Sequence, residues 1–111
     1  MSAASLPSLD RTLAALADPE RRLAVDLLRA GPRRAGELAS ELGVPPSAMS
    51  RHLKVLRASG LVEEHHPDFD ARVRIYRLRP EPMVELKAWL AETERGWVQQ
   101  LAAFRAHVER T

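Results

Sequence analysis

The side chains with the clearest chemistry lie in one stretch, VPPSAMSRHLKVLRASGLV, over residues 44–62. Its two prolines can begin a helix but cannot lie inside one, so the stretch predicts a helix over about 46–58. At about 100° per residue, Met49, Leu53 and Leu56 share one side of that helix and form its core face. The opposite side and its flank carry small, polar and basic residues, namely Ser47, Ser50, Arg51, Lys54 and Ala58.

Hydroxyl, guanidinium and ammonium groups on a face with little bulk suit the major groove of DNA, which accommodates one helix. Arg51 has the two-pronged donor set that recognises guanine, and Ser47 and Ser50 can bond to bases or phosphates. Lys54 lies nearer the helix end, where phosphate contacts are more usual. A merely solvated polar face would have the same composition.

The charge of the chain is concentrated around this helix. Residues 44–80 contain seven Lys/Arg against four Asp/Glu, whereas the whole chain has a net charge of only +2. A local basic excess is a modest indication of a polyanionic partner.

Two predicted strands, over 61–66 and 72–78, form a hairpin after the helix. Arg72 and Arg74 follow its turn, so we expect them to contact phosphates beside the groove. Asp68 and Asp70 occupy the turn and would repel phosphate. An edge hairpin protected by charged residues is the alternative interpretation.

Histidines offer two further possibilities. His65 and His66, with Asp68 and Asp70, could bind zinc or nickel near the turn, although adjacent strand residues point to opposite faces. A solvated turn is the simpler interpretation. His52 borders the core face of the predicted helix, so we expect an edge histidine held by a hydrogen bond.

The remaining predicted helices decide the order of elements along the chain. A helix over about 8–17 precedes one capped by Asp18 and begun by Pro19, with Leu23, Leu27, Leu28 and Ala24 expected on its buried side. A short helix follows and ends at Gly43. The predicted fold is mainly α with a small β-hairpin, in the order α-α-α-α-β-β-α, which is a winged helix-turn-helix. We expect a flexible segment over 1–7, a DNA-binding domain over 8–80 and a dimerisation helix over 81–111.

The long last helix carries an apolar stripe at steps of three, four and seven residues. A domain this small cannot cover the stripe alone, so a second copy of the chain is the expected partner. The predicted dimer-interface residues are Leu9, Leu13, Leu86, Leu90, Trp97, Leu101, Phe104 and Val108.

Composition excludes other classes of function. The chain lacks cysteine, which excludes disulfides and thiolate chemistry. No apolar run is long enough for a membrane span and no signal-peptide pattern is present, so we expect a cytoplasmic protein. Ser50 and His52 would point about 160° apart on the helix, which disfavours a hydrolase. We expect neither catalysis nor a cofactor.

Three stretches, LADPERRLAVDLL, ELASELGVPPSAMSRHLKVLRASGLV and YRLRP, resemble the ArsR/SmtB family of winged-helix repressors. The resemblance implies a homodimer that binds operator DNA near its own promoter, with base contacts at Ser47, Ala48, Ser50 and Arg51. It also implies where metal sites would lie, and Arg34 and Gly36 stand where thiolate-sensing members have cysteines. In the last helix, Gly96 and Arg110 replace the ligands that would accompany His107. The sequence thus predicts an autoregulatory repressor bound to an inverted repeat, with its effector unknown. A winged helix used for protein–protein contact, and a metal-responsive repressor using the wing, are the alternatives.

Overall fold

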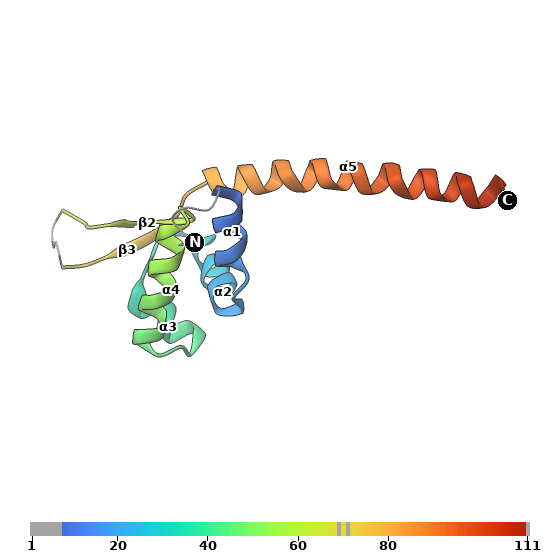
Figure 1. Cartoon of the computed structure of the whole chain (residues 1–111). Coiled ribbons are helices and arrows are strands. Elements are labelled where there is room, and N and C mark those ends of the chain that lie inside the picture. Colours follow the sequence, from blue (N-terminus) through green and yellow to red (C-terminus); the bar gives the residue numbers. More distant parts are fainter. Residues whose placement is uncertain (1–7, 69, 71, 111) are drawn as a thin grey trace.

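The computed structural model describes residues 8–68, 70 and 72–110, and shows a small helical body from which one long helix extends (Figure 1). The elements in chain order are α1 (Ser8–Leu16), α2 (Pro19–Leu28), β1 (Arg33–Arg34), α3 (Ala35–Leu42), α4 (Pro46–Ala58), β2 (Val62–His65), β3 (Ile75–Leu78) and α5 (Glu81–Arg110). The predicted winged helix-turn-helix is confirmed. The flexible segment predicted over 1–7 lies outside the described residues.

The junction of α1 and α2 is fixed by five consecutive residues, DPERR. As predicted, Asp18 caps α2: its Oδ1 accepts from the backbone N–H groups of Glu20 at 2.8 Å and Arg21 at 3.2 Å. The guanidinium of Arg21 donates to the Ala15 carbonyl at 2.6 Å, and that of Arg22 donates to the Leu16 carbonyl at 2.7 Å. One short segment therefore satisfies both the free carbonyls that end α1 and the free N–H groups that begin α2.

The core forms where α2, α3, α4 and the sheet meet, and α4 contributes Met49, Leu53 and Leu56, all buried as predicted. The predicted buried side of α2 was wrong in one respect. Leu23 is 49% exposed, and Val25 is buried in its place beside Ala24 and Leu28. Leucines occur on two sides of this ten-residue helix, so only tertiary packing decides its rotation.

The sheet has three antiparallel strands in the order β1-β3-β2, so the predicted two-stranded hairpin was incomplete. Arg33 pairs with Tyr76 and Arg34 with Ile75. β2 pairs with β3 from Val62–Leu78 to His65–Ile75, after which the two arms continue as the wing. A strand of two residues has no alternation, which explains why the sequence pattern did not reveal it.

Helix α5 has 30 residues, which gives a length of about 45 Å at 1.5 Å per residue. Its beginning packs against α1, and its carboxyl-terminal half extends far from the body (Figure 1). The molecule therefore measures 70 × 29 × 26 Å. Within the described residues, neither α5 nor any other helix is long and apolar enough to span a membrane.

Candidate nucleic-acid interface

Helix α4 presents the polar face that the sequence predicts. Ser47, Ser50, Arg51 and Lys54 are all exposed, on the side away from the buried core residues. Ala48, the remaining predicted contact on this helix, is partly buried and packs against the core. It therefore lies at the border of the exposed face. A small side chain there keeps the backbone accessible to a close ligand.

The first turn of α4 adds positive potential to this face. The residue before the helix is Pro45, and no side chain caps the helix start. The N–H groups of Ser47 and Ala48 therefore lack the acceptor that a capping side chain would supply. The positive end of the helix dipole points the same way and favours an anionic oxygen.

The two cations of the face, Arg51 and Lys54, differ from most basic side chains of the protein. Within the described part of the chain, neither forms an ion pair, although Arg57, one turn later, bonds to Glu64 at 2.7 Å. An unpaired cation can meet a phosphate or a base without first giving up an internal carboxylate. The face is thus both exposed and electrostatically available.

Glu64 connects this helix to the wing. Its side chain is only 9% exposed and lies 2.7 Å from Arg57 of α4, 3.0 Å from His66 and 3.6 Å from Arg74. It also accepts a hydrogen bond from the Tyr76 hydroxyl at 3.3 Å. Burial, with the nearby Glu64 charge, raises the pKa of Tyr76 above its usual 10.0. Glu64 therefore sets the wing relative to α4, a role that sequence reasoning missed because its partners lie in three segments.

The wing arginines are exposed but not unpaired. Arg72 holds Asp70, with its Nε 3.2 Å from Oδ1, and Arg74 faces Glu64. Hydrogen bonds from the backbone and side chain of Arg72 lower the pKa of Asp70 below its usual 3.8. DNA contact at the wing would therefore require each arginine to exchange a carboxylate for a phosphate.

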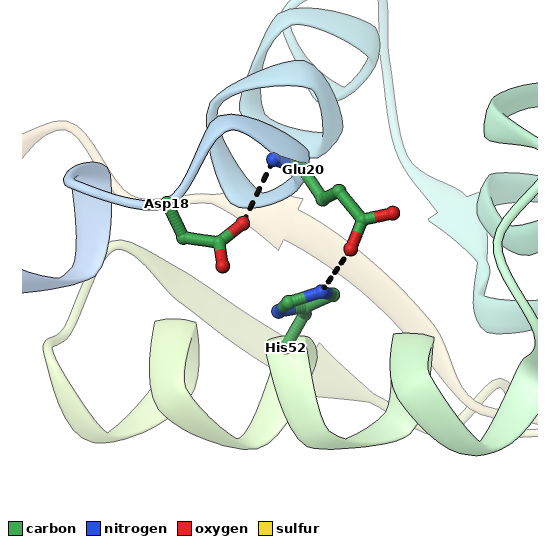
Figure 2. Close-up of side chains that lie close together, drawn as sticks. All are labelled: Asp18, Glu20 and His52. Atoms are coloured by element: carbon green, nitrogen blue, oxygen red, sulfur yellow. Dashed lines mark hydrogen bonds and ion pairs between the residues drawn. The ribbon is translucent and has the colours of Figure 1, made fainter.

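The four wing residues considered as metal ligands, His65, His66, Asp68 and Asp70, either bond to other residues or are exposed. His66 bonds to Glu64 and to the Val73 carbonyl, and Asp70 to Arg72. His65 and Asp68 are exposed. Among the described residues, the group that brings three metal-type ligands together is instead Asp18, Glu20 and His52. In that group His52 is the hydrogen-bonded edge histidine that was predicted, with Nε2 3.0 Å from Glu20 Oε1 (Figure 2).

A second surface is the apolar stripe of α5, the helix that extends from the body (Figure 1). Leu86 is half-buried, whereas the later members of the stripe are exposed by 52% to 67%. These exposed side chains are Leu90, Trp97, Leu101, Phe104 and Val108. On α1, Leu9 is half-buried and Leu13 is 39% exposed. Six of the eight predicted interface residues are thus exposed on α1 and α5.

Comparison with known proteins agrees with this geometry. The model of the arsR family of bacterial regulatory proteins matches residues 18–64, which include the tight α2 start and all of α4. The chain is 37% identical over 97 residues to the HTH-type transcriptional regulator Rv2034 of Mycobacterium tuberculosis, and the alignment covers 87% of this chain and 85% of that protein. The chain belongs to the ArsR family.

Solved structures support the assignment to the ArsR family. The ArsR-like transcriptional regulator from Rhodococcus sp. RHA1 superposes with a TM-score of 0.74 at 30% identity, covering 87% of this chain and 89% of that one. A solution structure of Mb0332 from Mycobacterium bovis, described as a homodimeric winged helix-turn-helix DNA-binding domain, gives a TM-score of 0.63 at 26% identity. That match covers 84% of this chain and 83% of the solved chain, which is a fragment of Mb0332. The protein is therefore a DNA-binding transcriptional regulator of the ArsR family.

Proposed function

We propose that this ArsR-family regulator is a homodimer that represses transcription by binding an inverted-repeat operator, including one near its own gene. The observation that carries the proposal is the geometry of α5, which leaves the body (Figure 1). Its exposed side chains include Leu90, Trp97, Leu101 and Phe104, which share one side of the helix at about 100° per residue. Exposed apolar patches of this kind mark association surfaces. The homodimeric state described for Mb0332 supports the same arrangement.

Pairing through α5 and α1 would give the DNA interface its symmetry. A two-fold dimer presents two copies of α4, which suit half-sites about one helical turn, ~34 Å, apart. In each copy, Arg51 would bond to a guanine, Ser47 and Ser50 to bases or phosphates, and Lys54 to a phosphate. Ala48 would allow the close approach, and the wing residues Arg72 and Arg74 would add flanking phosphate contacts. A dimer placed over a promoter represses by excluding the polymerase.

Selection of bound sequences from a random duplex pool tests the operator. We expect the selected sequences to share an inverted repeat, and we expect the repeat to recur upstream of the regulator's own gene. Binding should weaken steeply with salt, because each Lys/Arg–phosphate contact releases counterions. Unsymmetrical selected sequences would contradict the proposal, and failure to bind any duplex at low salt would favour a protein–protein module.

Substitution of Trp97 tests the dimer. Trp97→Glu places a charge within the apolar stripe, so sedimentation should show a monomer that has lost tight operator binding. Val84→Glu is the matched control, because Val84 is 66% exposed on the same helix but lies about 140° from Trp97 around its axis. If Trp97→Glu remains dimeric, the interface lies elsewhere.

A further inference from the structure

Three metal-ligating side chains converge where the start of α2 meets α4 (Figure 2). Asp18 and Glu20 belong to the first turn of α2, and His52 lies in the middle of α4. One donor atom from each lies within 4.8 Å of the other two, and His52 Nε2 is 3.0 Å from Glu20 Oε1. Residues 32 positions apart are thus brought together by the packing of the two helices.

The charges of this group leave an excess of negative charge. Two carboxylates face one imidazole, and Asp18 forms an ion pair with Arg21, whose Nη1 lies 3.9 Å from Oδ2. The guanidinium of Arg21 is already bonded to the carbonyls of Ala15 and Ala14 at the end of α1. Partial desolvation acts to raise the pKa of Asp18, but hydrogen bonds from the backbone of Arg21 and Glu20, and the charges of Arg21 and His52, lower it below its usual 3.8. Asp18 is therefore ionised at neutral pH.

We propose that Asp18, Glu20 and His52 form a binding site for a divalent transition metal of the zinc class. Imidazole nitrogen with carboxylate oxygens is a donor set that zinc accepts, whereas calcium and magnesium take oxygen ligands. The donors of a tetrahedral zinc ion lie about 3.5 Å apart, given metal–ligand bonds of about 2.0–2.2 Å. Donors now within 4.8 Å reach that spacing by small side-chain rotations, for which the half-exposed Glu20 has the freedom.

The remaining coordination position would face solvent. The His52 side chain is 13% exposed and that of Glu20 is 48% exposed, so an ion between them would be open to water on the Glu20 side. His52 Nε2 donates to Glu20 Oε1, and this hydrogen bond holds the ring in a position from which Nε2 can bind the ion.

The position of the site would make metal binding affect DNA binding, a consequence that rests on the proposed function. His52 is adjacent to Arg51 on the helix that would enter the groove. An ion here joins α2 to α4 and neutralises two carboxylates near a surface that would bind a polyanion. We therefore expect zinc to tighten operator binding by about fivefold or more.

Equilibrium dialysis of the metal-free protein against zinc alone tests the site without DNA. We expect one bound ion per chain, and His52→Gln and Glu20→Gln should each weaken binding by about tenfold or more. Both substitutions keep a side chain that can hydrogen bond between the helices, so the fold should persist, which circular dichroism checks. The matched control is His65→Gln, which alters an exposed histidine at the end of β2 and should leave zinc binding unchanged.

Each alternative outcome overturns the site. Wild-type protein that binds no zinc, or binds it equally well as His52→Gln, contradicts the proposal. Loss of binding in His65→Gln would move the site to the wing. Fluorescence anisotropy with operator DNA, with zinc or with a chelator, tests the coupling: an affinity that is unchanged or weakened by zinc contradicts it. If the metal-free protein ignores DNA altogether, the proposed function fails and the dialysis result still decides the site.

Discussion

Replacing the two unpaired cations of α4 one at a time separates recognition of bases from contact with phosphates. Arg51 and Lys54 are exposed, and within the described part of the chain no carboxylate pairs with either. Truncating either side chain to alanine should therefore change the free energy of unfolding by no more than about 0.5 kcal/mol. Any larger effect of these substitutions on DNA binding then reports on the interface alone.

The expected magnitudes follow from two copies of each residue in the proposed dimer. A bidentate arginine–guanine contact is worth about 1–3 kcal/mol, so losing two costs about 2–6 kcal/mol, or about 30-fold to more than 10⁴-fold in operator affinity. A phosphate contact carries no sequence information. Lys54→Ala should instead reduce the slope of log affinity against log salt by about 1.8 per dimer, at about 0.9 per phosphate contact.

Fluorescence anisotropy at several salt concentrations, on operator and on unrelated DNA, measures both effects. Arg51→Ala should weaken operator binding and reduce the preference over unrelated DNA, whereas Lys54→Ala should weaken both alike. Arg95→Ala removes the same charge from the exposed surface of α5, about 160° from Trp97 around the helix, and serves as the control. Operator affinity and specificity that survive in Arg51→Ala would refute the assignment of the groove-facing side.

Three further predictions concern stability and ionisation. Leu56→Ala empties a fully buried position and should destabilise the fold by about 2–5 kcal/mol in urea unfolding, whereas Val55→Ala, at a position 40% exposed, should cost clearly less. Tyr76, the single tyrosine, should titrate above 10.0 in absorbance measurements. Glu64→Gln removes a neighbouring negative charge and should bring the pKa of Tyr76 closer to 10.0. An unchanged pKa in that variant would contradict the contact between Glu64 and Tyr76. Asp18 has a lowered pKa in the fold, so its contribution is complete above its usual 3.8 and is lost as pH falls through the folded value. Asp18→Asn should remove that acid-dependent part of the stability, which urea midpoints at neutral and acid pH compare.

The sequence predicted the parts of the fold that depend on local patterns. The bounds and buried side of α4 follow from two prolines, one apolar stripe and a glycine stop, and Asp18 acts as the cap that its position before Pro19 indicates. The edge position of His52 also followed from helical periodicity. Each of these features is set by residues within a few positions of one another, where spacing alone constrains geometry.

Features that depend on distant partners could not be predicted in this way. β1 exists because Arg33 and Arg34 pair with β3, which lies about 40 residues later in the chain. Two residues are too few to show the alternation of side chains that predicts a strand. The role of Glu64 depends on its ion pairs with Arg57 of α4 and Arg74 of the wing, which are brought next to it only by the folding of the chain. The contact between His52 and Glu20 of α2 could not be predicted either. Helical periodicity shows on which side of a helix a residue lies, but not which residue packs against it.

The central claim is that two copies of the chain, joined through α5, bind one operator with both α4 helices. Sedimentation velocity with a labelled duplex that carries the selected repeat tests this claim most directly. We predict a dimer in the absence of DNA and a complex of two chains per duplex. A monomer that binds one chain per duplex, or a dimer that leaves the duplex sedimenting free at low salt, would contradict the account.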